Sequence, residues 1–344
     1  MFDKAFNALL LVGGLRYTLS LALCSLLLAP CSSVDAQQAG KAFRIGVLNG
    51  GTASNYSGLL EGFRRELSKL GWIEGKNIRI EYRFADQKQE RLPELAIELV
   101  RLKVDVIVVG GLPGVSAAKG ATTTIPIVMT TVGDPVATGL VASLARPGGN
   151  VTGLSSLVNE LNTKRLEVLK DAVPKLTRVG LLWSQAAGGS RGVELQLKEL
   201  RSAAVALKLR VEEIETQRDN NSLESAFQTA KEKQVGAILT TGTPFFFSER
   251  KWLVELARKF RLPAIYHQKE FVDEGGLMSY GADFDDLYRH AAVYVDKILK
   301  GAKPADLPVQ QATKFEFIIN LKAAKQIDLT IPVNVLERAN KVIK

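Results

Sequence analysis

The sequence predicts an α/β fold with two Rossmann-like lobes, each built on a parallel sheet and joined to the other by a hinge. From Phe43 onward, short β-rich runs alternate with segments of helical period, which is typical of βαβ units. Several runs, such as Val104–Val109, are almost continuously apolar, as expected of strands covered on both faces. The Gly-rich segment Arg146–Asn150 divides the series into two similar halves.

The first 36 residues have the features of a secretion signal. Tyr17–Ala29 contains six leucines and no charge, and Lys4 and Arg16 precede it. A short apolar stretch with basic residues on its N-terminal side indicates a signal peptide rather than a membrane span. Small residues at both ends of Val34–Ala36 predict cleavage before Gln37, and hence a periplasmic protein.

Two alternatives to a cleaved signal remain. Cys31 could carry a lipid, although Pro30 stands where a small Gly or Ala is usual, and the apolar stretch Ala5–Leu15 could form an uncleaved anchor. Both cysteines, Cys24 and Cys31, lie in this segment. The chain that follows it therefore offers no disulfide, thiolate nucleophile or Cys-bound metal.

Strands are expected wherever β-branched and other apolar residues cluster between turn formers. The expected strands are Phe43–Asn49, Ile78–Phe84, Val104–Val109, Ile125–Val132, Val179–Ser184, Arg210–Ile214, Val235–Thr240, Leu262–Tyr266, Leu277–Tyr280 and Phe315–Asn320.

Between the strands, apolar residues recur at helical spacing. Three such stripes are clear: Leu60, Phe63, Leu67 and Leu70; Val193, Leu197, Leu200, Ala204 and Leu207; and Leu287, Ala291, Tyr294 and Ile298. A final helix is expected after Pro332.

The number of strands is too large for one small sheet, so they are divided between two lobes. The first lobe is expected to comprise residues 43–153 and about 280–305, and the second residues 154–279 and about 306–344. The chain would first cross between lobes near residues 150–157, and the C-terminal segment would return to the sheet.

Composition excludes several classes of protein. Of 344 residues, 46% are apolar and 24% charged, which is average for globular domains and argues against disordered, collagen-like or polytopic membrane chains. The formal charge is +9, but basic residues are interspersed with acidic ones. The excess is therefore interpreted as a solvated surface, and no nucleic-acid partner is expected.

A binding site is expected beyond the carboxyl ends of the strands, where loops meet helix N-termini. The loops at that edge are Asn49–Tyr56, Gly110–Ser116, Thr130–Pro135, Ser184–Ser190, Thr241–Phe247 and His267–Phe271. Several are rich in Gly, Ser, Thr and Asn, whose backbone N–H groups and hydroxyls suit a carboxylate or phosphate.

Enzyme motifs are incomplete. Gly110–Gly114 follows a strand but matches neither the dinucleotide fingerprint nor the P-loop, and Gly114–Ala118 lacks the second glycine of a nucleophile elbow. His267 and His290 are the only histidines, and no acidic residue is spaced to form a metal pair with either. We therefore expect no catalytic residue, no metal and no cofactor.

Three features allow two interpretations. Asp283–Asp286 lacks the pattern of a calcium loop and is better explained as a helix N-cap with carboxylates in the first turn. Asp134, before Pro135, could cap a turn or contact a cationic ligand group. Phe245–Phe247 stand at an expected helix start, where three consecutive rings cannot all face one core, so one could line a pocket.

Several motifs, taken together and in order, resemble the periplasmic substrate-binding proteins of ABC transporters, of the tryptophan/tyrosine type. The segments that carry the resemblance are Gly71–Asn77, Thr124–Val128, Gly133–Val136, Arg146–Gly153, Gly275–Gly281 and Ile298–Gly301. The resemblance spans residues 43–342. It implies a type I periplasmic binding protein fold, two lobes with three crossings that close on a small molecule, and delivery of that molecule to an inner-membrane permease.

The resemblance also implies a set of ligand-binding residues in the cleft loops. With the loop residues considered above, they are Asn49, Tyr56, Gly111, Ser116, Thr131, Asp134, Ser184, Gln185, Thr243, Phe245 and His267. In Gly242–Phe245 this chain departs from its relatives, whose corresponding loop is more polar. Loss of an acid there could remove a partner for a ligand amino group, so an aromatic or apolar carboxylate without an amine competes with an amino acid.

The expected function is that of a monomeric, non-catalytic solute receptor of an ABC importer. Thr and Ser hydroxyls with helix N-terminal N–H groups would hold a carboxylate, and Tyr56 or Phe245 would pack on its apolar part. Two alternatives remain: a periplasmic sensor that presents the solute to a membrane receptor, and an α/β enzyme.

Overall fold

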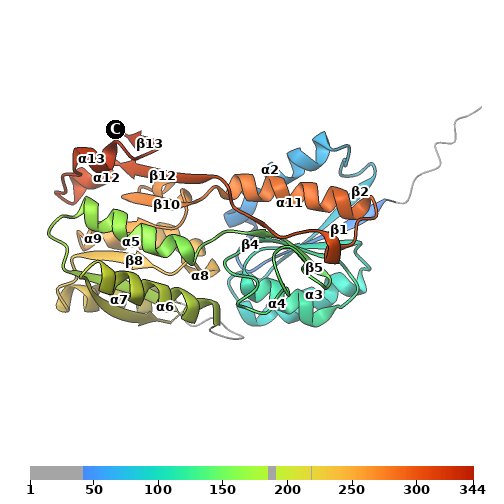
Figure 1. Cartoon of the computed structure of the whole chain (residues 1–344), viewed down its shortest axis with the longest axis horizontal. Helices are drawn as coiled ribbons and strands as arrows, with labels where there is room; N and C mark the ends of the chain where they lie inside the picture. Colours follow the sequence, from blue (N-terminus) through green and yellow to red (C-terminus); the bar gives the residue numbers. More distant parts are fainter. Residues whose placement is uncertain (1–41, 185–190, 218) are drawn as a thin grey trace, which may run out of the picture. The chain divides into compact units, whose positions relative to one another are not determined.

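The computed structural model describes residues 42–184, 191–217 and 219–344. The predicted signal peptide, with Cys24, Cys31 and the cleavage point before Gln37, lies outside the described residues, as does Gln185. Two sheets account for the strands (Figure 1). The prediction of an α/β fold with two parallel-sheet lobes is confirmed.

The first sheet has the strand order β11-β5-β4-β3-β1-β2 in the described chain. Its strands are β1 (Phe43–Asn49), β2 (Ile78–Phe84), β3 (Val106–Val109), β4 (Ile127–Val132), β5 (Val151–Ser155) and β11 (Gln310–Gln311). All of the pairings in this sheet are parallel.

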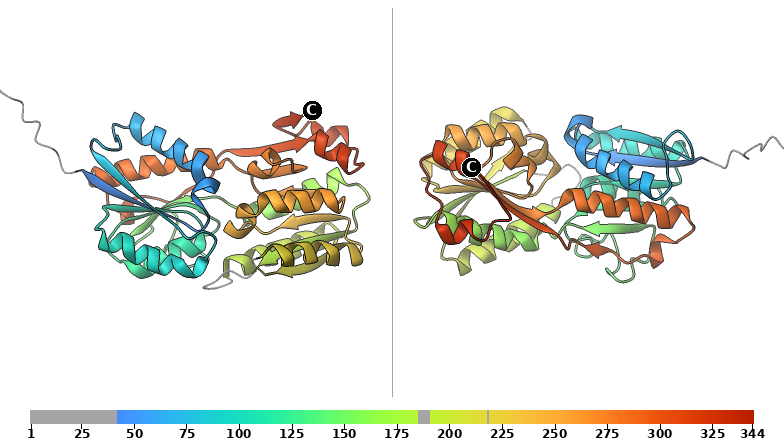
Figure 2. Two further views of the ribbon diagram at one scale, coloured as in Figure 1. Left: turned by 180° about the vertical axis from the view of Figure 1, so that it is seen from behind. Right: turned by 90° about the horizontal axis from the view of Figure 1, so that it is seen from above.

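Helices cover both faces of the first sheet (Figure 2). One face is covered by α2 (Ala53–Lys69) and α11 (Phe284–Leu299), the other by η1 (Gln89–Arg91), α3 (Leu92–Arg101) and α4 (Leu112–Ala121). Side chains of β3 alternate between these layers, because Val106 and Val108 pack with α2 and α11 while Ile107 and Val109 pack with α3 and α4. Burial on both faces explains why this strand is apolar throughout.

The second sheet has the order β13-β12-β10-β9-β8-β6-β7. Its strands are β6 (Arg178–Ser184), β7 (Arg210–Thr216), β8 (Ala237–Thr240), β9 (Ala264–Tyr266), β10 (Met278–Ala282), β12 (Phe315–Asn320) and β13 (Lys341–Ile343). β12 runs antiparallel to β10, and the other pairings are parallel. The C-terminal segment thus returns to the sheet, as predicted.

The helices of the second lobe also form two layers. They are α5 (Glu160–Ala172), α6 (Arg191–Ala206), α7 (Asn220–Glu232), α8 (Pro244–Ser248), α9 (Arg250–Lys259), α10 (Glu270–Asp273), α12 (Leu321–Gln326) and α13 (Val333–Leu336). α5 and α6 pack on the face that presents Leu181, Leu239 and Ile265, and α7 and α9 pack on the opposite face.

Two sequence expectations need correction. The first crossing was expected near residues 150–157, and the chain does leave the first sheet after Ser155, but Val151–Ser155 forms a strand, β5, that the sequence did not predict. The edge strands β11 and β13 were not anticipated. Since β11 pairs with β5, residues 310–311 belong to the first sheet, and η2 (Pro304–Asp306) precedes them.

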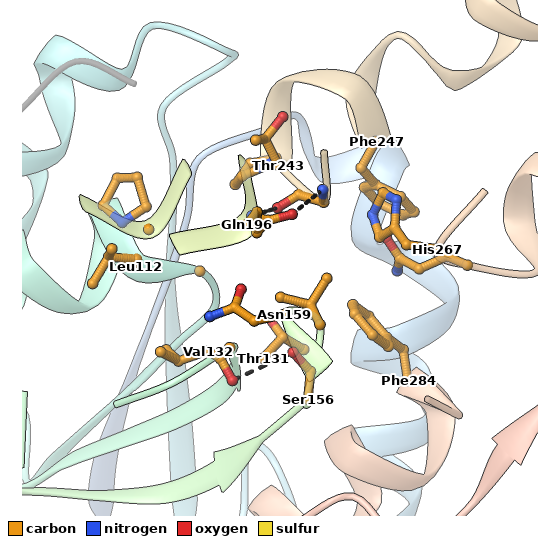
Figure 3. A pocket seen from close by; sticks show the side chains of 18 of the residues that line it. Leu112, Thr131, Val132, Ser156, Asn159, Gln196, Thr243, Phe247, His267 and Phe284 are labelled. Atoms are coloured by element: carbon orange, nitrogen blue, oxygen red, sulfur yellow. Dashed lines mark hydrogen bonds between the residues drawn. The ribbon is translucent and has the colours of Figure 1, made fainter. Parts of the chain in front are cut away.

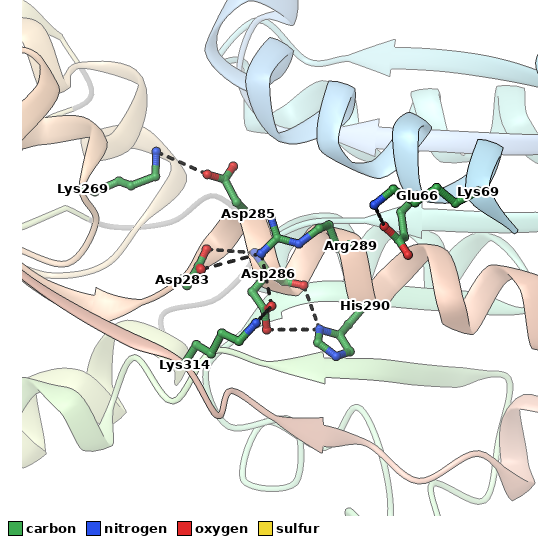
Figure 4. Close-up of polar contacts among 9 residues, drawn as sticks. All are labelled: Glu66, Lys69, Lys269, Asp283, Asp285, Asp286, Arg289, His290 and Lys314. Carbon is green, nitrogen blue, oxygen red and sulfur yellow. Dashed lines mark hydrogen bonds and ion pairs between the residues drawn. The ribbon is translucent and has the colours of Figure 1, made fainter. Parts of the chain in front are cut away.

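Charged side chains gather where α11 begins and where the chain runs from β11 to β12 (Figure 4). Asp283 caps α11 by accepting a hydrogen bond from the Asp286 backbone N–H at 2.9 Å, which confirms the predicted N-cap. The Asp286 carboxylate pairs with Lys314 at 2.6 Å and with Arg289 at 3.2 Å. Lys269, before α10, pairs with Asp285 at 3.4 Å. Ion pairs therefore connect the second lobe to the start of α11.

Candidate functional site

A cavity of about 120 Å³ lies at the carboxyl ends of strands from both sheets. It is lined by Tyr56, Leu59, Gly111, Leu112, Pro113, Thr131, Val132, Gly133, Asp134, Thr138, Ser156, Val158, Asn159, Gly192, Val193, Gln196, Gly242, Thr243, Pro244, Phe247, His267, Gln268, Phe284 and Tyr288. A cavity of about 150 Å³ is enough to admit benzene, so this one has nearly the room for a single aromatic ring.

One wall of the cavity is aromatic (Figure 3). Phe247 of α8 and Tyr56 of α2 contact each other with ring centroids 5.6 Å apart. Phe284 and Tyr288 stand four residues apart in α11, so both project from one helix face into the cavity. Such a wall can stack on, or meet edge-to-face, the apolar part of a ligand.

Asp134 is the only acidic side chain among the described residues of the lining, which include no Lys or Arg. The Asp134 Oδ1 atom accepts hydrogen bonds from the backbone N–H groups of Val136 (3.0 Å) and Ala137 (2.9 Å). The carboxylate therefore caps the turn after β4 and still faces the cavity. Turn capping and ligand contact, which the sequence left as alternatives, are compatible here.

Polar uncharged groups complete the lining. Gln196 of α6 is fixed by two bonds to Gly242: its Oε1 accepts from the Gly242 N–H at 2.7 Å, and its Nε2 donates to the carbonyl at 3.2 Å. Thr243 caps α8 by accepting from the Phe246 N–H at 3.3 Å. These bonds hold the loop after β8 in place, as a rigid site requires.

Loops of the two lobes approach closely at two glycines. Gly111, which precedes α4, has φ +75°, and a Cβ there would meet Pro244 Cγ at 3.2 Å. A Cβ on Gly192 of α6 would meet Leu112 Cδ2 at 2.8 Å. The helix N-termini of α4 and α6 can come together at the cavity because these positions carry no side chain.

His267 is buried in the cavity wall beside Phe271, with ring centroids 5.3 Å apart. Burial, and secondarily the positive charge of Arg165, lower the pKa of His267 from 6.5 to about 3. The imidazole is therefore neutral at physiological pH. Its Nδ1 atom is buried and has no hydrogen-bond partner among the described residues.

Six of the eleven residues expected from the sequence line the cavity: Tyr56, Gly111, Thr131, Asp134, Thr243 and His267. Four described ones do not. Asn49 is buried behind the wall and accepts a 3.4 Å hydrogen bond from Tyr288 Oη. Ser184 is buried at the end of β6, and Phe245 packs in the core. Ser116 is exposed on α4. Gln185 lies outside the described residues.

The three consecutive phenylalanines require a correction. Phe245, Phe246 and Phe247 are all buried in the same core cluster, which the sequence analysis considered impossible. All three rings can be buried because α8 lies between the second sheet and α2. Each ring therefore points toward other protein atoms, although the three side chains leave the helix in different directions. One of them does line the cavity, but it is Phe247 rather than Phe245.

Sequence reasoning missed several lining residues, among them Phe284, Tyr288, Asn159 and Gln196. Tyr288 and Phe284 flank an apolar helical stripe that was attributed to the core. Their four-residue spacing, directly after the N-cap Asp283, was the signal that could have found them.

In the described ranges, metal-ligating side chains are dispersed. No group of three or more His, Cys, Asp or Glu side chains is placed there to hold a metal. Across residues 42–184, 191–217 and 219–344, no helix combines the length and apolar character needed to span a bilayer. What the site can do is enclose a small molecule that has an aromatic part and polar ends.

Comparison with known proteins agrees with this. The profile of the ABC transporter substrate binding protein family matches residues 51–343. A protein of Clostridioides difficile named tyrosine-binding protein is 30% identical over 272 residues, or 78% of this chain and 76% of that protein.

Two solved structures are similar over their whole length. An ABC domain from Streptococcus pneumoniae in complex with L-Trp has a TM-score of 0.77 and 27% identity, covering 87% of this chain and 100% of that one. The ligand-free, open structure of a substrate-binding protein with adhesive properties from Clostridium difficile has a TM-score of 0.64 and 26% identity, covering 88% and 99%.

Proposed function

The chain belongs to the ABC transporter substrate-binding protein family, and we propose from this premise that it binds an aromatic amino acid for import. The observation that carries the proposal is the cavity, which combines a wall of Phe247, Phe284 and Tyr288 with one carboxylate, that of Asp134. An aromatic amino acid offers a ring that can pack on the aromatic wall and an ammonium group that can pair with the carboxylate.

The sequence cast doubt on an amino-acid ligand because the loop Gly242–Phe245 lacks an acid. Asp134 would supply the acidic partner instead, since it faces the same cavity from the first lobe. The ligand carboxylate would then lie toward the hydroxyl of Thr243 and the amide of Gln196. Charge-assisted hydrogen bonds of this kind are about twice as strong as neutral ones. The names of two similar proteins, tyrosine-binding and in complex with L-Trp, support the same ligand class.

Binding would proceed by closure of the two lobes. Ligand contacts from both lobes at once stabilise a closed state over an open one. The lining draws on α2, α4 and α11 of the first lobe, and on α6, α8 and the two residues after β9, His267 and Gln268, of the second. The two structural relatives have nearly equal identity, yet the ligand-free open one has a TM-score of 0.64 against 0.77 for the L-Trp complex. Lobe movement would produce such a difference.

The loaded protein would deliver its ligand to an ABC transporter permease in the inner membrane. Proteins of this family typically work outside the cytoplasm, and residues 1–36 are proposed to direct export and to be cleaved before Gln37. Family members are receptors rather than enzymes, so we propose no reaction. We propose that the protein acts as a monomer.

The test is a ligand panel on residues 37–344. Calorimetry with L-tyrosine, L-tryptophan and L-phenylalanine should give binding, and their amine-free phenylpropionate analogues should bind at least ten-fold more weakly. A ligand at 100 times its Kd adds about 2.7 kcal/mol to stability, so a parallel melting scan should rise with the same ligands.

The Asp134→Asn variant tests the contact with the ligand ammonium group without disturbing the turn that Asp134 caps. Asparagine keeps the Oδ1 acceptor for Val136 and Ala137 but removes the charge, so amino-acid affinity should fall while binding of the amine-free acids does not. Asp171→Asn, which removes a surface carboxylate paired with Arg338 at 2.6 Å, is the matched control. If none of these ligands binds the unaltered protein, the proposal is wrong.

A further inference from the structure

Arg165 of α5 is completely enclosed, with 1% of its surface exposed. It donates to the carbonyl oxygens of Val158 (2.7 Å) and Tyr280 (3.2 Å) and to Asn162 Oδ1. All three acceptors are uncharged, and Nε has no partner among the described residues. No carboxylate of the described chain forms an ion pair with it.

Such a side chain is costly to bury. Taking an ion out of water costs several kcal/mol even after relaxation, and buried charges are normally paired with an opposite charge. Burial lowers the pKa of Arg165 to about 9, so the guanidinium still carries its charge at neutral pH. The folded protein therefore holds a positive charge that nothing nearby in the described chain neutralises.

This charge lies directly behind the wall of the cavity. Val158, whose carbonyl accepts from Arg165, lines the cavity, and so does His267. The register pairs Ser279 with Tyr266, so Tyr280, the second carbonyl acceptor, stands beside His267. A Cβ on Gly281 would lie only 1.9 Å from the His267 carbonyl, which shows how closely these segments pack.

The lining itself has an unbalanced charge. Among its described residues Asp134 is the one carboxylate, and it comes from the first lobe, whereas Arg165 lies behind the wall of the second. In a low-dielectric interior the attraction between charges at a given distance is stronger than in water. A zwitterion with its ammonium at Asp134 would therefore be drawn by its carboxylate toward the Arg165 side.

We propose that Arg165 is a specificity-determining residue for the ligand carboxylate, which it attracts through the wall formed by Val158 and His267 without touching it. The inference rests on the proposed function and names the part of the ligand that the second lobe selects. The neutral ring of His267 and the Thr243 hydroxyl, which both line the cavity, would make the direct contacts.

The test compares L-tyrosine with L-tyrosinamide, which keeps the ring and the amine but has no carboxylate. The unaltered protein should prefer L-tyrosine by at least ten-fold in Kd. Arg165→Gln should reduce that ratio at least ten-fold, and Arg165→Lys, which keeps the charge, should preserve most of it. A purely structural role for Arg165 would weaken both ligands equally and leave the ratio unchanged, which would overturn the inference.

Arg178→Gln is the matched control, because Arg178 starts β6, at the end of the strand opposite to the cavity, and pairs with Glu212 at 3.8 Å. It should leave the ratio unaltered. Should Arg165→Gln fail to fold, the salt dependence of the unaltered protein decides the matter. At 0.5 M salt, interactions between exposed charges are screened within roughly a few Å. A preference for L-tyrosine over L-tyrosinamide that persists from 0.05 to 0.5 M salt therefore supports a buried charge. A preference that disappears over this range overturns the inference.

These outcomes are separable from those of the proposed function. If no aromatic amino acid binds the unaltered protein, the proposed function is wrong. If L-tyrosine and L-tyrosinamide bind it equally well, the receptor function stands and only the role of Arg165 is refuted.

Discussion

Arg250 Nη1 donates to Asn55 Oδ1 at 3.2 Å, and so joins α9 of the second lobe to α2 of the first. The same guanidinium lies 4.9 Å from the ring centroid of Phe247 and pairs with Glu274 at 3.3 Å. A single side chain thus contacts a ring of the cavity wall and the facing lobe, which couples occupation of the cavity to contact between the lobes.

Arg250→Ala should raise the Kd of the bound amino acid by about 5- to 30-fold, the equivalent of the 1–2 kcal/mol that such a contact contributes. Most of the change should be in the dissociation rate, because the loss of a binding contact acts mainly on dissociation. Stopped-flow tryptophan fluorescence measures both rates. Arg261→Ala, which removes an exposed pair with Asp328, is the control, and equal dissociation rates in the two variants would refute the coupling.

Alanine variants of Phe247 and Phe245 should distinguish an effect on ligand binding from an effect on stability. Both rings are buried, so replacing either by alanine should cost about 3–5 kcal/mol of unfolding free energy. Only Phe247→Ala should also weaken ligand binding, since Phe245 packs against Phe246, with centroids 5.3 Å apart, and not on the cavity. Urea unfolding with calorimetry on the folded fraction makes the comparison. Equal loss of affinity in both variants would contradict it.

His267 should make stability depend on pH. Its pKa is about 3 in the folded protein against 6.5 ordinarily, so below pH 6.5 the unfolded chain takes up a proton that the folded protein does not. Stability should therefore decrease as the pH falls from 6.5 toward 3, by about 1.4 kcal/mol per pH unit from this group. Urea unfolding at pH 7, 6, 5 and 4 measures the slope.

His267→Gln removes this titration and should flatten that slope by one proton. His290→Gln is the matched variant, since it removes the only other histidine of the chain. A slope that His267→Gln leaves unaltered would show that the imidazole is hydrated in the folded state.

Trp72 should anchor α11 to the first lobe. Its Nε1 donates to Asp296 at 2.8 Å, and Asp296 also pairs with Lys300 at 2.7 Å. Asp296→Ala leaves the indole N–H without its partner and should cost about 1–3 kcal/mol. Asp296→Asn keeps an acceptor oxygen and should cost less. Denaturant melts followed by near-UV absorption of the indole distinguish the two, and identical midpoints would argue against the bond.

Sequence alone located strands buried on both faces, such as β3, because burial leaves an apolar run, and it also located the partly exposed edge strands β2 and β7. β5 was missed for a local reason. Gly153 has φ +126°, and a Cβ there would lie 2.2 Å from the Met129 carbonyl oxygen. This strand therefore needs glycine to approach β4, and a glycine that follows Gly148-Gly149-Asn150 so closely resembles part of a turn in a single sequence.

The cavity was partly predictable because the carboxyl ends of parallel strands share an edge. That rule placed Thr131, Asp134, Thr243 and His267 correctly at the cavity. It could not place Phe284 and Tyr288, which reach the cavity from a helix that starts after a crossing. Nor could it reveal Arg165, since an arginine in a helix is ordinarily exposed, and only the three-dimensional packing encloses this one.

The first lobe is discontinuous in sequence, since α11 and β11 come more than 120 residues after β5. Its core contains Leu287, Ala291 and Tyr294 of α11 together with Leu60 and Phe63 of α2. While the chain is being synthesised, these residues of α2 have no α11 to cover them until the second lobe has almost been completed. Contacts so distant in sequence form slowly. The N-terminal half therefore cannot complete its core until most of the chain has been synthesised, and under the export proposed above this delay would leave the chain time to cross the membrane before folding.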